Sequence, residues 1–141
     1  MLNQANIYLL GIGGIGMSAL ARYFHSSGRK VYGYDRYRSA LCKKLEEEGM
    51  KIHYEDEPKS IPKSFTKDST LVIYTPAIPS DHLELNFFKD QGYTLRKRAQ
   101  ILGEIAQMHQ CLAVAGTHGK TTTSSLLAHL FRHNQKDISA F

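Results

Sequence analysis

Two glycine-rich stretches contain the residues of this sequence that are best suited to chemistry. The first follows the apolar residues 7–10, leads into Met17-Ser18-Ala19, and reads Gly11-Ile12-Gly13-Gly14-Ile15-Gly16. A strand that stops at glycines and restarts as a helix offers free N–H groups to a phosphate. In this pattern Gly11 allows a tight turn, Gly13 lets a phosphate approach the backbone, and Gly16 lets the helix pack closely on the strand.

The second stretch follows the apolar residues 111–115, which we expect to form a buried strand, and reads Gly116-Thr117-His118-Gly119-Lys120-Thr121-Thr122-Thr123. Successive backbone N–H groups in such a turn form a nest for an anion. Lys120 can act catalytically as a point charge on the terminal phosphates, and the Thr121 hydroxyl can hold Mg²⁺. The spacing departs from the usual phosphate loop, because Ala115 stands five positions before Lys120. We therefore predict a shortened ATP-binding loop.

The elements that must position these loops alternate between strands and helices from residue 6 to about residue 108. Helices are expected at residues 14–27, 39–48 and 81–91, and a glycine ends each of them. Ser39 is the expected N-cap of the second helix. At the start of the third, Asp81 with Glu84 fits a capping box, and the expected buried face of that helix consists of Leu83, Phe87 and Phe88. A further helix begins at Arg98. This alternation predicts an α/β fold: a Rossmann-like parallel sheet flanked by helices, followed by the first strand-loop-helix of a P-loop ATPase domain.

Two other strand ends belong to the same candidate site. Asp35 ends the second expected strand and follows Gly16 by about 20 residues, where a Rossmann unit carries the acid that accepts from a ribose hydroxyl. An ordinary turn aspartate is the alternative for that position. The most apolar strand, residues 70–75, leaves the sheet at Thr75-Pro76-Ala77-Ile78, which places these residues at the carboxyl edge where open α/β sheets bind ligands. A rigid turn without a ligand is the alternative there.

Composition bounds the class of partner. The chain has 141 residues, is 42% hydrophobic and carries a formal net charge of +5. Its basic residues are scattered and lack interleaved aromatic residues, so neither the charge nor the sequence predicts nucleic-acid binding. No apolar run is long enough to cross a bilayer and no signal pattern opens the chain, which predicts a cytoplasmic protein without membrane contact. Cys42 and Cys111 are expected to be buried, reduced thiols. The sequence carries no signature of a particular oligomeric state.

The two loops in this order, together with residues 75–78 and Arg98-Ala99-Gln100-Ile101-Leu102, resemble the Mur ligases of peptidoglycan synthesis over the whole chain. His118 and the intact first loop point to the branch that joins L-alanine to UDP-N-acetylmuramate. The resemblance implies that residues 1–108 bind the UDP part of the substrate and that residues 109–141 begin a central ATP-binding domain. Tyr34 is a departure, because many relatives have a small hydroxyl residue before the acid.

The resemblance also implies roles for individual residues. The UDP part of the substrate would contact Gly11, Ile12, Gly13, Gly14, Ile15, Gly16, Met17, Ser18, Asp35, Thr75, Pro76, Ala77 and Ile78. ATP would contact Gly116, Thr117, His118, Gly119, Lys120, Thr121 and Thr122, with Lys120 as the catalytic cation and Thr121 on Mg²⁺. The implied reaction activates the muramic carboxylate as an acyl phosphate, which the amine of alanine then attacks.

The family's remaining catalytic residues would lie beyond Phe141, so we expect this piece to bind the UDP-sugar without ligase activity and without a tightly held cofactor. A dinucleotide-binding domain, of a dehydrogenase or a regulatory module, explains residues 1–108 equally well but leaves the second loop unexplained. A non-catalytic interaction module is a third interpretation. Within the family, the ligase that recycles preformed peptides is the alternative.

Overall fold

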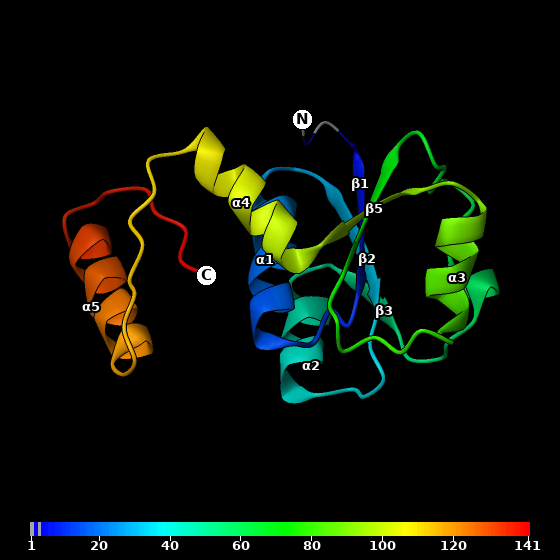
Figure 1. Cartoon of the computed structure of the whole chain (residues 1–141), viewed down its shortest axis with the longest axis horizontal. Coiled ribbons are helices and arrows are strands. Elements are labelled where there is room, and N and C mark those ends of the chain that lie inside the picture. The colour runs from blue at the N-terminus through cyan, green and yellow to red at the C-terminus, as the bar shows by residue number, and fades with distance from the viewer. Residues whose placement is uncertain (1, 3) are drawn as a thin grey trace.

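A five-stranded parallel sheet is the centre of the computed structural model, which describes residue 2 and residues 4–141 (Figure 1). The strand order is β3-β2-β1-β4-β5. The strands are β1 (Asn6–Leu10), β2 (Lys30–Tyr34), β3 (Lys51–His53), β4 (Thr70–Tyr74) and β5 (Thr94–Lys97). The helices are α1 (Ile15–Ser26), α2 (Ala40–Glu47), the 3₁₀ turn η1 (Pro58–Ser60), α3 (Leu83–Asp90), α4 (Arg98–Met108) and α5 (Lys120–His133). The predicted α/β alternation is confirmed.

Both faces of the sheet are covered by apolar packing. Ile7 and Leu9 of β1 face a core shared with α1, α2 and α4, whereas Tyr8 and Leu10 face the second core, which includes Phe88 of α3. Figure 1 shows α1, α2 and α4 on one side of the sheet and α3 on the other. All five residues of β1 are buried, as a central strand covered on both faces requires.

Helix α3 differs from the capping box expected at its start. The Asp56 carboxylate accepts hydrogen bonds from the Leu83 and Glu84 N–H groups at 2.8 and 3.0 Å, so a residue from the loop after β3 caps the helix. The N-cap position is held by His82, not Asp81. Leu83 is 57% exposed while Glu84 is fully buried, so the expected apolar face was wrong at Leu83.

Glu84 is buried because it has partners on two strands. The Tyr8 hydroxyl donates to its Oε2 at 2.6 Å, and Nε2 of His53 lies 2.5 Å from its Oε1. A buried carboxylate is tolerated only when its oxygens are hydrogen-bonded in this way. Burial, and then the negative charge of Glu84, raises the pKa of the Tyr8 phenol well above its ordinary value.

Residues 109–141 do not join the sheet. The structure describes α5 in this segment but no strand, and Leu112, Leu126 and Leu130 are each more than half exposed. The strand expected at residues 111–115 was therefore wrong, because an isolated strand has no neighbour to accept its backbone hydrogen bonds. Cys111, expected to be buried, is exposed, whereas Cys42 is buried as expected.

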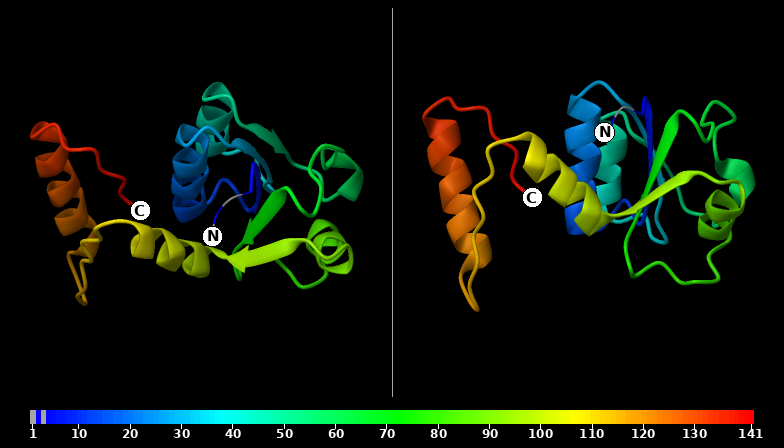
Figure 2. Two further views of the ribbon diagram at one scale, coloured as in Figure 1. Left: turned by 90° about the horizontal axis from the view of Figure 1, so that it is seen from above. Right: turned by 45° about the horizontal axis from the view of Figure 1, so that its top comes forward.

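Helix α5 stands apart from the sheet in both views of Figure 2. We call residues 1–108 the first unit and residues 109–141 the second unit. The second unit contacts the first at Tyr23, whose hydroxyl lies 3.2 Å from Nε2 of His109 and whose ring contacts that of Phe141. Among the helices that the structure describes, none has the length and apolarity needed to cross a membrane.

We predict that Tyr8→Phe lowers the free energy of unfolding at pH 7 by roughly 1.5–3 kcal/mol, because buried Glu84 loses a donor. The variant should also lose stability less steeply above pH 10. The raised pKa keeps the folded phenol protonated while the unfolded phenol ionises, so the wild type loses up to about 1.4 kcal/mol per pH unit through this group. Denaturant titrations at pH 7 and above pH 10 measure both effects.

Tyr37→Phe is the matched control, because that side chain is 68% exposed. An unfolding free energy of Tyr8→Phe equal to that of this control at both pH values would contradict the role given to the buried phenol.

Candidate functional site

The first glycine loop lies at the carboxyl edge of the sheet, beside the central strand β1. The N–H groups of Gly11 and Ile12 both donate to the Tyr34 carbonyl at the end of β2, at 2.8 and 3.1 Å. Gly11 has a φ of +83°, in the left-handed region that glycine adopts without strain. The chain moves from β1 to β2 on one side and later to β4 on the other, and ligands of open α/β sheets bind at such a reversal.

Asp35 is part of this loop's structure. Its Oδ2 accepts from the Gly13 N–H at 2.7 Å, and its Oδ1 accepts from the Tyr37 N–H at 3.2 Å. A Cβ atom at Gly13 would lie 2.5 Å from the Cys42 sulfur and 2.9 Å from Oδ2 of Asp35. Both the turn interpretation and the ligand interpretation placed Asp35 at this edge, but neither identified its bond to the loop.

Gly16 also has a neighbour that the sequence did not indicate. A Cβ atom at Gly16 would lie 2.6 Å from Nη1 of Arg98, the first residue of α4, so the space beside this glycine holds a guanidinium group. The glycine pattern predicts close packing of the helix on its strand at Gly16. The structure instead places a basic side chain against the first turn of α1.

A cavity of about 380 Å³ opens beside the loop, on the α3 side of the sheet. It brings together Gly11, Asp35, Ala77 and Ile78, all of which the sequence predicted for one site. Thr75 does not line the cavity, but its hydroxyl lies near Gly11, 4.0 Å from where a Cβ atom on that glycine would stand. Pro76 and residues 12–18 are not among its lining residues. The remaining lining residues are Tyr34, Arg36, Asp56, Pro79, Asp81 and His82.

The polar wall of this cavity was missed by sequence reasoning. His82 is buried, with its Nδ1 3.0 Å from Oδ1 of Asp56, and its ring packs edge-on against Tyr34 with the ring centroids 4.6 Å apart. Burial, followed by the charge of Asp56, raises the pKa of Tyr34, so the phenol stays protonated and able to donate. The position of Asp56 after β3 is the one available signal, because carboxyl ends of parallel strands share an edge.

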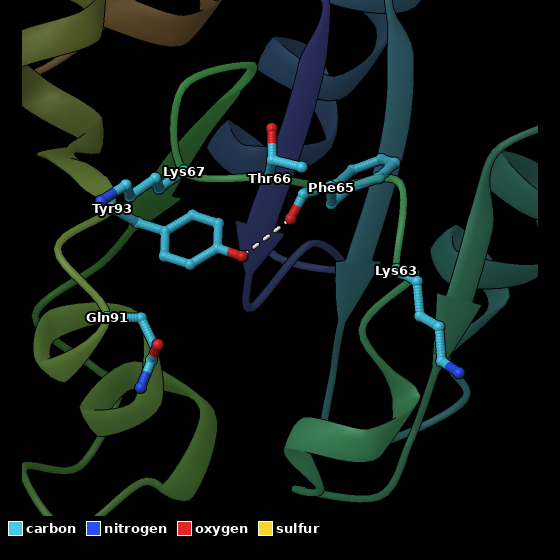
Figure 3. Close-up of a pocket in the computed structure, with 6 residues that line it drawn as sticks. All are labelled: Lys63, Phe65, Thr66, Lys67, Gln91 and Tyr93. Carbon is cyan, nitrogen blue, oxygen red and sulfur yellow. Dashed lines mark hydrogen bonds between the residues drawn. The ribbon is translucent and has the colours of Figure 1, made fainter.

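A second cavity, of about 290 Å³, lies at the opposite edge of the sheet (Figure 3). It is formed by residues that precede β4 and β5, and the Tyr93 hydroxyl donates across it to the Phe65 carbonyl at 2.7 Å. None of the residues predicted from the sequence to bind a ligand lines it. We therefore place the candidate site at the carboxyl edge.

The second glycine loop forms a separate, exposed turn. Gly119 has a φ of +76° and is the N-cap of α5, so the helix begins at Lys120 as a phosphate loop requires. The Lys120 ammonium group donates to the carbonyls of Gly116 and Thr117 at 2.7 and 3.3 Å, which closes the turn on itself. The structure does not bring this loop together with the first one, since α5 stands apart from the sheet in Figures 1 and 2.

The donor set at the second loop fits Mg²⁺ carried by a nucleotide. The described residues contain no cluster of three or more His, Cys, Asp or Glu side chains that could hold a metal by themselves. Mg²⁺ is commonly held by one or two protein oxygens together with substrate phosphates and waters. The hydroxyl of Thr121, in the first turn of α5, is a ligand of that kind.

Neighbouring glycines provide a matched test of the first loop. We predict that Gly13→Ala destabilises the fold by about 1–3 kcal/mol, because the new methyl group meets Cys42 and Asp35 in a packed site. Gly14→Ala should cost less than about 1 kcal/mol, since its Cβ would make only ordinary contacts of 3.5 Å or more. Equal denaturation midpoints for the two variants would contradict this account of the loop.

Comparison with known proteins gives a consistent family. The profile described as "Mur ligase family, catalytic domain" matches residues 6–110. The chain is 56% identical over 137 residues to the UDP-N-acetylmuramate–L-alanine ligase of Cytophaga hutchinsonii, a match that covers 96% of this chain and 29% of the relative. The chain thus spans less than a third of the length of that curated relative.

Solved structures agree on the fold. The UDP-N-acetylmuramate–alanine ligase of Thermotoga maritima superimposes with a TM-score of 0.82 at 31% identity, covering 92% of this chain and 30% of that one. A murein peptide ligase from Psychrobacter arcticus gives a TM-score of 0.77 at 29% identity, covering 93% and 27%. Because the family profile matches residues 6–110 and the relative from Cytophaga hutchinsonii is 56% identical over 96% of the chain, this chain belongs to the Mur ligase family.

Proposed function

We propose that this chain is the N-terminal part of an ATP-dependent ligase that joins L-alanine to UDP-N-acetylmuramate in the cytoplasm. In this proposal residues 1–108 form the domain that binds the UDP-sugar, and residues 109–141 begin the domain that binds ATP. The observation that carries the proposal is the occurrence of two phosphate-type loops in one chain that is 56% identical, over nearly its whole length, to a relative named for this reaction. The chain itself has no predicted contact with nucleic acid or membrane.

The first unit supplies a place for each part of a uridine diphosphate. The 380 Å³ cavity has polar groups on Tyr34, Asp56 and His82 that suit a base and ribose. The N–H groups of residues 11–14 already have acceptors within the protein, but the first turn of α1, which follows this loop, has backbone N–H groups without an acceptor among the described residues, and these suit the diphosphate. In this arrangement Gly11, Ala77 and Ile78 line the nucleoside side of the site, and the residues up to Ser18 hold the phosphates.

The second unit supplies the groups for activating a carboxylate. ATP phosphorylates the muramic carboxylate to an acyl phosphate, the amine of alanine attacks the acyl carbon, and inorganic phosphate leaves. Lys120 would turn from the carbonyls of Gly116 and Thr117 to the oxygens of the transferred phosphoryl group and neutralise their charge. Mg²⁺ bound with ATP would share that neutralisation, and the Thr121 hydroxyl would be its protein ligand.

Dinucleotide binding by a dehydrogenase-type unit is the alternative for residues 1–108, but it gives the second glycine loop no role. Asp35 does not separate the two interpretations, because its carboxylate accepts one N–H group on each oxygen, from Gly13 and Tyr37, and keeps further lone pairs for a ribose hydroxyl. Relatives at 52–56% identity are named for the alanine-adding reaction, which supports that branch over the recycling ligase.

Thermal unfolding with added nucleotides tests the proposal. We expect UDP-N-acetylmuramate to raise the melting temperature more than UDP does, and NAD to leave it unchanged, because only a ligand bound to the folded state stabilises it. Stabilisation by NAD alone would overturn the proposal in favour of a dinucleotide-binding module. The absence of a shift with any nucleotide would favour a non-catalytic interaction module.

Turnover is a separate prediction. We expect the 141-residue chain to release no phosphate from Mg·ATP with UDP-N-acetylmuramate and alanine above the level of Lys120→Ala, since the described residues include no cluster of three or more His, Cys, Asp or Glu side chains that could hold the metal. Phosphate release above that control would show that these residues suffice for catalysis. In the full-length enzyme, acceptance of a preformed tripeptide in place of alanine would identify the recycling ligase instead.

A further inference from the structure

The first turn of α1 has backbone donors without acceptors. Among the described residues, none accepts a hydrogen bond from the N–H groups of Ile15, Gly16 or Met17, and the first intrahelical bond runs from Ser18 to the Gly14 carbonyl. The N-cap residue Gly14 has no side chain to cap the helix, and the first turn contains no acidic residue. In the part of the chain that the structure describes, the N-terminus of α1 therefore has no negatively charged side chain of the protein to accept from it, whereas the N–H of Gly13, earlier in the loop, has Asp35.

The other end of the loop holds a negative charge of the protein itself. Asp35 occupies the Gly13 N–H at 2.7 Å, so that donor is already satisfied and the carboxylate lies directly beside it. A diphosphate placed against Asp35 would meet a like charge, which is unfavourable at short range. The charges of the loop therefore direct a diphosphate toward the α1 side, away from Asp35.

Arg98 provides the opposite charge at that side. Its guanidinium lies against Gly16, where an added Cβ would be 2.6 Å from Nη1 and 3.2 Å from Cζ. The side chain is half-buried, and within residues 4–141 no carboxylate pairs with it. The neighbouring Arg96, two residues earlier, does pair with an acid, Glu104, at 3.6 Å. Among the described residues, Arg98 is thus a cation without a carboxylate partner, and its guanidinium lies beside Gly16 in the turn whose N–H groups have no acceptor.

We infer that Arg98 is a binding residue for the diphosphate of the substrate, and that Gly16 is a glycine because the Arg98 guanidinium needs its space. The inference deepens the proposed function and rests on it. A guanidinium presents two parallel N–H donors that match two phosphate oxygens, a geometry that a lysine ammonium cannot reproduce. In this arrangement the nucleoside lies on the Asp35 side of the loop, and the muramic sugar extends from the diphosphate past Arg98.

Isothermal titration of the 141-residue chain with UDP and with inorganic pyrophosphate tests the inference. We expect Arg98→Gln to weaken UDP binding about tenfold, which corresponds to about 1.4 kcal/mol, and to weaken pyrophosphate binding by a similar factor. Arg98→Lys should recover only part of the loss. Arg96→Gln is the matched control, because it removes the same charge from the same segment, and it should change the affinity by less than twofold.

Gly16→Ala tests the geometry independently of charge. The helical position accepts alanine, so the variant should unfold at the same or a slightly higher temperature, but its methyl group must displace the flexible end of Arg98. Gly16→Ala should therefore weaken UDP binding by displacing Arg98. The double variant Gly16→Ala with Arg98→Gln should then bind UDP about as weakly as either single variant, because the effects of coupled residues are not additive. A hundredfold loss in the double variant would show that the methyl group blocks the ligand directly and would overturn the assignment of Gly16.

The outcomes separate this inference from the proposed function. If the wild type binds UDP and Arg98→Gln binds it equally well, the role of Arg98 is wrong while the proposed function stands. If the wild type binds pyrophosphate in an Arg98-dependent way but does not bind UDP, the anion contact stands and the proposed function fails. If the wild type binds neither ligand, both are overturned.

Discussion

The hydrogen bond from the Gly13 N–H to Asp35, 2.7 Å long, is the contact on which the site depends. It joins the loop after β1 to the end of β2, and it is reinforced by the bonds from Gly11 and Ile12 to the Tyr34 carbonyl. With the loop fixed in this way, the first turn of α1 points its free N–H groups at the carboxyl edge. Tyr34 and Asp35 also line the cavity beside the loop, so the same contact holds one wall of that cavity in place.

The two loops differ in how much of the fold supports them. The first is bounded by β1, whose five residues are all buried, and by α1, which packs into the core through Met17 and Leu20. The second is bounded by an exposed segment and by α5, in which the structure describes no buried residue. The first loop is therefore organised before a ligand arrives. The second must break the bonds of Lys120 to its own carbonyls before the ammonium group can reach a phosphate.

The sequence predicted features that follow from local patterns. The helices at α1, α2 and α4, the Ser39 cap and the parallel sheet are signalled by periodicity, turn glycines and β-branched runs. The face of α3 was mispredicted because Glu84 is buried by Tyr8 and His53, which are distant in sequence, and capped through Asp56. The reasons for Gly13 and Gly16 are likewise contacts with Asp35, Cys42 and Arg98, and glycine motifs do not reveal their partners. Residues 111–115 have the composition of a strand, but no neighbouring strand is described with which they could pair, so the structure assigns no strand there.

The central claim is that the carboxyl edge of this sheet, and not the cavity beside Tyr93, holds a uridine diphosphate. Backbone amide chemical shifts recorded during a titration with UDP-N-acetylmuramate measure this residue by residue. The account predicts saturable shifts at Gly11, Ile15, Gly16 and Met17, with none at Lys67 and Gln91 at the opposite edge. Shifts confined to Lys67, Gln91 and their neighbours, or none at the first turn of α1, would contradict it.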